Sequence, residues 1–468
     1  MNLPETIEQA HRSLMKKEFS CTELIRTYLD KIKKENKEFN DFLNLTEKLA
    51  LEEAKAVDDK ISQREKIGPL EGIPMAIKDN ILVEDYEATA GSRILKDYIA
   101  PYDATVIKKL KEIGAIIIGK TNLDEFAMGS STENSAFGVV KNPVDTTRVP
   151  GGSSGGSAVA VAANHCLGAL GSDTGGSIRQ PAAFCGIIGF KPSYGMVSRY
   201  GLIAMASSLD QIGSLAKNVD DVRLIFNTIR GRDAFDSTTV EIEEFKNSTH
   251  HLRIGIPKEF FGEGIDRELK EKVEKEINKF SEFGFEIREI SLPYSEYALA
   301  AYYIIMPAEV SANLARYDGI KYGFSKKTQN LLDNYLKTRA EGFGSEARRR
   351  IILGTYVLSA GYRDAYYNKA QRIRTLIKED FERVFKEVDF ILTPTTPTPA
   401  FKIGEKTDPL SMYLSDIYTV PVNLAGLPAI SMPCGKVDSL PIGLQIIGPQ
   451  FKDDLVLETA QIYEQLNQ

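Results

Sequence analysis

Residues 150–179, PGGSSGGSAVAVAANHCLGALGSDTGGSIR, contain two loops of small residues on either side of an apolar stretch. The loops are 151–157 (GGSSGGS) and 171–177 (GSDTGGS). Glycine-rich backbone marks places where a chain bends sharply or approaches a ligand closely, and successive N–H groups there can surround an anionic oxygen. A flexible linker is the alternative, but apolar segments adjoin each loop and would bury it. We therefore predict that both loops belong to one site inside a folded domain.

Short apolar runs alternate with helical patterns around these loops. Strands are predicted at 73–77, 116–118 and 167–170, and a helix at 103–113 with Gly114 just past its end. Such alternation is typical of an α/β fold in which helices cover both faces of a sheet.

The flanking segments complete a single predicted domain over residues 1–468. Residues 1–65 are predicted to be helical, with a capping box at Ser20 and Glu23 and a second helix over 45–61. Residues 66–230 form the predicted core. A polar connector is predicted over 231–252, followed by a strand at 252–256 and helices up to about residue 390. A loop without regular structure is predicted at 392–401 (LTPTTPTPAF). Strands at 429–432 and 444–447 and a closing helix from Asp453 complete the prediction.

Composition excludes several functional classes. The net charge of −7 argues against a surface that binds nucleic acid by itself, and the densest basic stretch is only residues 348–350. Four widely spaced cysteines predict buried thiols in a reducing compartment rather than a disulfide framework. Neither a signal peptide nor a run near the ~20 apolar residues of a membrane span is found. We expect a soluble protein of the bacterial-type cytoplasm, or of an organelle after import, with no metal site.

Phosphate, histidine and cysteine chemistries fit these residues poorly. Residues 114–121 (GAIIIGKT) match the phosphate-loop pattern, but the middle positions are an apolar strand where a phosphate loop needs an open turn. None of the four histidines lies in a polar, turn-rich setting, and no G-x-S-x-G elbow surrounds Ser177. Cys185 has no matching histidine arrangement. A serine nucleophile would therefore need another base.

Lys78 is the remaining candidate for that base. An exposed lysine has a pKa of ~10.4 and is protonated at neutral pH, whereas burial disfavours the charged form. Lys78 ends the apolar run 72–78, so its stem is expected in the core. A surface lysine paired with Asp79 is the alternative, and the run alone leaves both interpretations open.

Taken together, Lys78 and the two glycine–serine loops resemble the amidase signature family over about residues 66–216. The resemblance implies a mixed, twisted sheet covered by helices in one domain. It also implies that Ser177 is the nucleophile, that Ser153, preceded by a cis peptide bond, relays the proton, and that neutral Lys78 is the base.

The family pattern implies further roles in the same loops. Ser154 and Arg179 would support the loops without reacting. Glycine would be required because a side chain would keep the carbonyl oxygen of the substrate away from the donors of the oxyanion hole. Those donors would be the backbone N–H groups of Thr174, Gly175, Gly176 and Ser177.

Segments outside the catalytic motifs resemble the glutaminase subunits of tRNA-dependent amidotransferases within this family. These segments are 119–132, 339–344, 350–356, 412–416 and 421–428. The resemblance implies that Arg350 binds the α-carboxylate of glutamine, Asp416 its α-ammonium, and that Tyr302 lines the pocket. The register of the arginine is open within 348–350, and a surface arginine with a helix-capping aspartate is the alternative.

The implied function is hydrolysis of glutamine and delivery of ammonia to a partner. By resemblance, B and C subunits would complete a heterotrimer, and the partner would hold the charged tRNA, ATP and Mg²⁺, so that this chain needs no cofactor. Either or both of Glu-tRNA(Gln) and Asp-tRNA(Asn) would be amidated. A free-standing amidase and a non-catalytic scaffold are the alternatives, and an exposed apolar face would count against the first.

Overall fold

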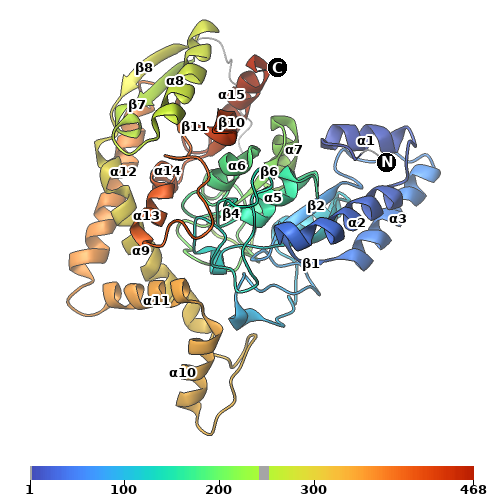
Figure 1. Cartoon of the computed structure of the whole chain (residues 1–468), viewed down its shortest axis with the longest axis horizontal. Helices are drawn as coiled ribbons and strands as arrows, with labels where there is room; N and C mark the ends of the chain where they lie inside the picture. Colours follow the sequence, from blue (N-terminus) through green and yellow to red (C-terminus); the bar gives the residue numbers. More distant parts are fainter. Residues whose placement is uncertain (1–2, 242–251, 468) are drawn as a thin grey trace.

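One sheet of eleven strands runs through the molecule in the order β1-β3-β2-β4-β6-β5-β10-β11-β9-β7-β8 (Figure 1). The computed structural model describes residues 3–241 and 252–467. The strands are β1 Phe42–Leu45, β2 Pro74–Lys78, β3 Ile116–Thr121, β4 Gly168–Asp173, β5 Ile188–Lys191, β6 Gln211–Ala216, β7 Arg253–Pro257, β8 Glu286–Ile290, β9 Phe390–Pro394, β10 Ala429–Val437 and β11 Leu440–Ile447.

The sheet is mixed and covered on both faces. Strand β2 pairs in parallel with β3 and β4, whereas β4 pairs antiparallel with β6. Every residue of β2, β3, β4 and β6 is buried, and because successive side chains point to opposite faces, both faces must be covered. The predicted α/β fold with a mixed sheet is confirmed.

Helices precede, connect and follow the strands. They are α1 Ile7–Met15, α2 Cys21–Phe39, α3 Glu47–Ser62, α4 Thr105–Glu112, α5 Gly155–Ala162, α6 Arg179–Cys185, α7 Val219–Ile229, α8 Arg267–Glu282, α9 Ala298–Asn313, α10 Leu331–Gly342, α11 Ser345–Leu358, α12 Lys369–Val384, α13 Pro409–Tyr413, α14 Val420–Ala425 and α15 Asp453–Leu466. The capping box at Ser20 and Glu23 is present, and the helices predicted at 45–61 and 103–113 are α3 and α4. Strand β1, directly before α3, was not predicted. Within the described residues no helix is long and apolar enough to cross a membrane.

The prediction that 392–401 has no regular structure is wrong at its start, because residues 392–394 belong to β9. Proline is tolerated there for a topological reason. Pro394 pairs with Leu444 of β11, but the other neighbour, β7, pairs only with Phe390 and Ile391. The N–H group that proline lacks is therefore not needed at the last position of the strand.

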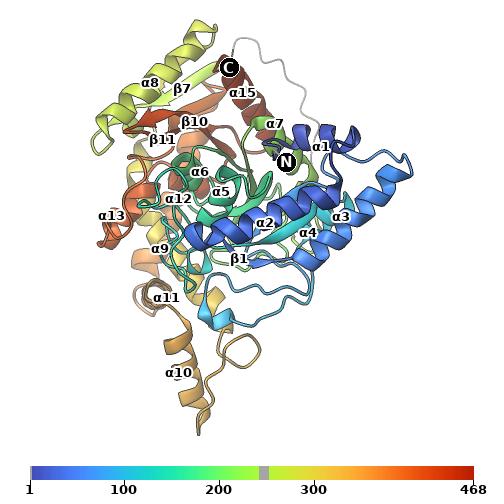
Figure 2. The same cartoon turned by 45° about the vertical axis from the view of Figure 1, so that its right-hand side comes forward.

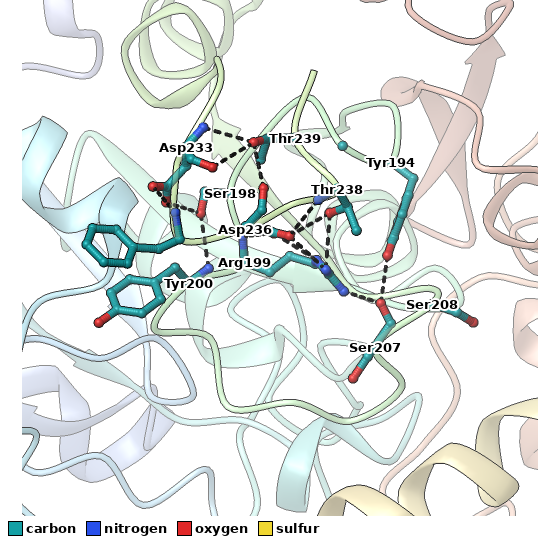
Figure 3. A network of polar contacts seen from close by, with 12 residues as sticks. Tyr194, Ser198, Arg199, Tyr200, Ser207, Ser208, Asp233, Asp236, Thr238 and Thr239 are labelled. Carbon is teal, nitrogen blue, oxygen red and sulfur yellow. Dashed lines mark hydrogen bonds and ion pairs between the residues drawn. The ribbon is translucent and has the colours of Figure 1, made fainter. Parts of the chain in front are cut away.

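Part of the predicted connector over 231–252 is tied to the core by the polar network in Figure 3. The Arg199 guanidinium donates to both carboxylate oxygens of Asp236, at 3.0 and 2.9 Å, and also to the carbonyl oxygen of Ser207. Asp233 accepts a hydrogen bond from Ser198. The network fixes the chain between residues 198 and 210, and residues 242–251 of the connector lie outside the described part.

That fixed segment ends beside the second glycine–serine loop. The carboxylate of Asp210 accepts hydrogen bonds from the N–H groups of Met205 and Ala206 and from the Thr174 hydroxyl, the last at 2.7 Å. Burial raises the pKa of Asp210 to about 6. Asp210 thus joins the loop held by Arg199 to the loop that follows β4.

Helices α9 and α11 pack closely where Gly354 lies against α9. A Cβ atom at Gly354 would lie 1.8 Å from the carbonyl oxygen of Pro307, which is backbone and cannot move aside cheaply. We expect Gly354→Ala to lower the free energy of unfolding by about 1–3 kcal/mol, as overpacking does, and to displace α11. Chemical denaturation would measure the loss, with Gly68→Ala as a control because no atom lies within 4 Å of a Cβ there and the backbone is not left-handed. An unchanged stability of Gly354→Ala would contradict this packing.

Candidate active site

Lys78 lies at the carboxyl end of β2 and faces three serine hydroxyls. Its Nζ atom is 2.8 Å from Oγ of Ser153, 2.8 Å from Oγ of Ser154 and 2.9 Å from Oγ of Ser172. Because β2 and β4 are parallel neighbours, their carboxyl ends meet at one edge of the sheet, which brings Ser172 beside Lys78. The lysine has no exposed surface.

Burial determines the protonation of Lys78. Desolvation of the ammonium lowers the pKa of Lys78 to about 7, against the opposing effect of the carboxylates of Asp124, Asp173 and Asp210. A large fraction of the amine is therefore neutral at neutral pH, as a general base requires. Asp79 is not the partner of Lys78, because it forms a fully buried ion pair with Lys120 at 2.9 Å.

The three hydroxyls around Lys78 are not equivalent. The Ser154 hydroxyl donates to the carbonyl oxygen of Ser172 at 3.1 Å, and the Ser172 hydroxyl accepts from the side-chain amide of Asn80 at 2.9 Å. Both hydroxyls can therefore accept the two N–H bonds of a neutral amine. This leaves the nitrogen lone pair for Ser153. Ser172 and Asn80 were missed from the sequence, although Ser172 lies within the second quoted loop.

Ser177 lies between β4 and α6, in the loop that packs against the Ser153 loop. The N–H group of Ser154 donates to the carbonyl oxygen of Ser177 at 3.1 Å, which joins the two loops. The peptide bond between Gly152 and Ser153 is cis. Ser177 is 8% exposed, and its hydroxyl makes no hydrogen bond to another residue in the described ranges, so it is free to approach a substrate.

A buried ion pair fixes the second loop. Arg179 donates from Nε and Nη2 to the two carboxylate oxygens of Asp173, both at 3.1 Å, and from Nη1 to Gln445 at 2.6 Å. The Asn423 amide donates to Asp173 at 2.9 Å. Although burial opposes ionisation, Arg179 holds the pKa of Asp173 well below its usual range. The structure thus places Arg179 in contact with the loop and with β11. Sequence inspection missed Asp173 and Asn423.

The predicted oxyanion hole is smaller by one donor. The N–H group of Gly176 donates to Asp173 at 2.8 Å, so it is not available to a substrate oxygen. Within residues 3–241 and 252–467, the N–H groups of Thr174, Gly175 and Ser177 donate to no other group. Gly176 has a φ of +133°, which other residues rarely adopt. Its role is therefore conformational, and three donors remain.

Of the three predicted substrate-binding side chains, Tyr302 lies against this loop and Arg350 is buried. The Tyr302 hydroxyl would lie 2.7 Å from a Cβ atom at Gly175. Among Arg348, Arg349 and Arg350 only Arg350 is buried, with 3% of its surface exposed. Burial thus selects Arg350 from the run whose register the sequence left open.

Asp416 is buried with an unpartnered carboxylate oxygen. Its Oδ2 atom accepts a hydrogen bond from Ser130, whereas Oδ1 has no hydrogen-bond partner in the described structure. Burial, assisted by the Asp173 carboxylate, raises the pKa of Asp416 to about 7, while Arg350 and Lys406 oppose the rise. The Thr419 side chain connects Asp416 to the second glycine–serine loop. Its hydroxyl lies 2.7 Å from the carbonyl oxygen of Gly175 and 3.1 Å from that of Asp416. A cation bound at Oδ1 would stabilise the ionised carboxylate.

The phosphate-loop match, the histidines and the cysteines were rejected as reactive groups from the sequence, and the structure shows where they lie. The string 114–121 includes β3, and Lys120 lies inside that strand in its pair with Asp79. The ring of His165 lies between two carboxylates, 2.8 Å from Asp41 and 3.0 Å from Glu35. All four cysteines are buried free thiols, and no group of three or more metal-ligating side chains occurs in the described residues.

Comparison with known proteins identifies the family. The amidase family model matches residues 23–457. The A subunit of the glutamyl-tRNA(Gln) amidotransferase of Thermoanaerobacter pseudethanolicus is 56% identical over 470 residues, which cover 99% of this chain and 96% of that protein. The crystal structure of the corresponding A subunit from Thermotoga maritima is 42% identical, with a TM-score of 0.80 over 98% of this chain and 94% of that one. A crystal structure described as an amidase is 29% identical, with a TM-score of 0.83 over 98% of this chain and 99% of that one. The chain, an α/β protein with a buried lysine among serines, belongs to the amidase signature family.

Proposed function

We propose that this chain hydrolyses glutamine through Ser177, Ser153 and Lys78 and supplies the ammonia to a partner protein. The observation that carries the chemistry is the 2.8 Å contact between Lys78 Nζ and Ser153 Oγ, buried beside the loop that holds Ser177. A neutral amine in this position accepts the proton of Ser153, and Ser153 in turn accepts the proton of Ser177.

The reaction proceeds through an acyl-enzyme. Ser177 Oγ attacks the side-chain amide carbon of glutamine, and its proton passes through Ser153 to Lys78. The negative oxygen of the tetrahedral intermediate receives hydrogen bonds from the free N–H groups of Thr174, Gly175 and Ser177. The proton returns through Ser153 to the leaving nitrogen, which departs as ammonia. Water then hydrolyses the ester to release glutamate and restore Ser177.

Glutamine suits the charges beside the loop. Arg350 is a buried cation that can bind an α-carboxylate, and Asp416 is a buried carboxylate with one free oxygen that can bind an α-ammonium. Burial raises the pKa of Tyr302. The Tyr302 ring lies 5.1 Å from the ring of Tyr303, which in turn lies 5.3 Å from the guanidinium carbon of Arg350. A simple amide would leave the free oxygen of Asp416 without a partner and would use none of the free N–H groups of Arg350.

A partner protein is supported by an exposed apolar face. The outer side of α11 exposes Ile352, which is 68% exposed, together with Leu353 and Tyr356. The Tyr356 ring lies 4.4 Å from that of Tyr362 and 6.3 Å from that of Tyr366, so the face continues beyond the helix. Faces of this kind mark protein interfaces, which disfavours a free-standing amidase.

The neighbouring helix exposes further apolar side chains. In α10, which extends away from the sheet in both views (Figures 1 and 2), three leucines are more than half exposed. They are Leu331, Leu332 and Leu336. The two amidotransferase relatives are both A subunits, a designation that implies further subunits beside them.

We assign the remaining steps to those further subunits. B and C subunits would complete the assembly, and the partner would hold charged tRNA, ATP and Mg²⁺ and amidate Glu-tRNA(Gln), Asp-tRNA(Asn) or both. The net charge of −7 on this chain agrees with tRNA being held elsewhere.

The test is ammonia release from glutamine by the chain alone and by the chain co-purified with its partner subunits. We expect partners supplied with tRNA and ATP to stimulate release at least about tenfold, because docking on the exposed face of α11 would favour the conformation that is competent for hydrolysis. Fast hydrolysis of simple amides by the lone chain, with glutamine ignored, would contradict the proposal.

A further inference from the structure

We infer that Glu346 is a positioning residue that holds Arg350 in place to receive the substrate carboxylate. The inference rests on the proposed function, since it assigns Arg350 to that carboxylate. Oε1 of Glu346 accepts a hydrogen bond from Nε of Arg350 at 2.7 Å and another from the Tyr413 hydroxyl at 3.0 Å. Glu346 and Arg350 lie one turn apart on the buried side of α11, where ion pairs are little screened by solvent.

Two stacked aromatic rings lie beside the guanidinium. The rings of Tyr303 and Tyr413 stack with their centroids 3.7 Å apart. The guanidinium carbon of Arg350 lies 5.3 Å from the first centroid and 5.5 Å from the second, so it sits to the side of the stack and the rings limit its sideways movement. Because Glu346 also receives the Tyr413 hydroxyl, the carboxylate orients both the guanidinium and one of the rings beside it.

The contacts leave one end of the guanidinium for a ligand. Nε is taken by Glu346, and Nη1 lies 3.5 Å from Sδ of Met306, a weak acceptor. Nη2 donates to no other group in the described residues. A carboxylate arriving from the substrate would therefore meet the Nη end, in a geometry that Glu346 has set in advance.

Glu346 also competes with Asp416 for the charge of Arg350. Asp416 carries a free oxygen, and Arg350 stabilises its ionised form. Without Glu346, Arg350 would be a buried cation whose remaining opposite charge is Asp416. The attraction between the two would then be unopposed, and a zwitterionic substrate would have to overcome it before binding.

The test measures steady-state ammonia release by the chain together with its partner subunits. Glu346→Ala is expected to raise KM for glutamine about tenfold or more, the value of one hydrogen bond to a charged group, with kcat within about threefold of wild type. Hydrolysis of butyramide, which has neither α-group, should be unchanged. Glu346→Gln keeps an acceptor for Nε and Tyr413 and should restore most of the affinity.

Glu341→Ala is the matched control, since Glu341 pairs only with the exposed Lys326 on the surface. It should leave both substrates unaffected. A KM for glutamine that is unchanged or lower in Glu346→Ala would overturn the inference, the lower value meaning that Glu346 competes with the substrate. Equal decreases in the hydrolysis of glutamine and of butyramide would mean that Glu346 supports the fold and does not position Arg350. A lower unfolding temperature shared by the Ala and Gln variants would mean the same. Retention of glutaminase activity by Ser177→Ala would instead refute the proposed function.

Discussion

Ser177→Ala is expected to lower kcat for ammonia release from glutamine by about 10⁴–10⁶-fold, the scale seen when a hydrolase loses its nucleophile. The Ser177 hydroxyl makes no hydrogen bond in the described structure, so its loss removes no internal contact and the fold should persist. KM should change little, because Arg350 and Asp416 remain. Ammonia release and mass spectrometry of the quenched enzyme, which detects a glutamyl ester only on the wild type, measure the two consequences.

The other serines provide graded controls for this experiment. Ser153→Ala interrupts the path from Ser177 to Lys78 and should cost about 10²–10⁴-fold in kcat, the usual range for acid–base groups. Ser154→Ala removes only an acceptor for a Lys78 N–H bond and a bond to the Ser172 carbonyl oxygen, so we expect a smaller loss. Substantial activity in Ser177→Ala, or a loss in Ser154→Ala that exceeds the loss in Ser153→Ala, would contradict the assigned order of proton transfer.

The sheet and the reactive loops could be predicted because local signals in the sequence agree with the final structure. The apolar runs at 73–77 and 116–118 form β2 and β3. The first glycine–serine loop leads into α5, and the second continues from the end of β4. Arg350 could be separated from its neighbours only in three dimensions, since residues 348–350 are identical in type and differ only in burial.

What could not be predicted depends on contacts between distant segments. Asn423 and Gln445 reach the Asp173–Arg179 pair from more than 240 residues away, and neither carries a local signal. The loss of Gly176 as an oxyanion donor follows from one hydrogen bond to Asp173 that composition does not specify. The prolines led us to predict a loop from residue 392. Pro394 can lie in β9 because β7 pairs only with the first two residues of that strand, which the sequence does not reveal.

Lys78→Met is expected to abolish glutamine hydrolysis almost as completely as loss of the nucleophile, by about 10³–10⁵-fold, because no other base lies against Ser153 in the described structure. In the wild type, kcat/KM should rise with pH and level off above about 7. Burial lowers the pKa of Lys78 to about 7, and the neutral amine that prevails above that pH is the active form. The residual activity of Lys78→Met should lack this rise. Activity in the wild type that falls as pH increases from 6 to 8 would contradict a neutral lysine base.

The same shift predicts how Lys78 affects stability. Its pKa is about 7 in the folded chain and close to its ordinary value of 10.5 in the unfolded chain, so between these pH values the unfolded chain binds more protons. The free energy of unfolding of the wild type should therefore rise relative to Lys78→Met as pH increases from 7 toward 10.5, by roughly 3–5 kcal/mol over the whole window. Denaturation of both proteins across this range measures the difference. A constant difference would mean that Lys78 remains charged in the folded protein, and the proton path from Ser177 through Ser153 would then have no acceptor. We expect the wild type to be less stable than Lys78→Met near pH 7, and this difference in free energy of unfolding to become smaller as pH increases. That result would show that burying a neutral amine beside Ser153 lowers the stability of the chain near neutral pH.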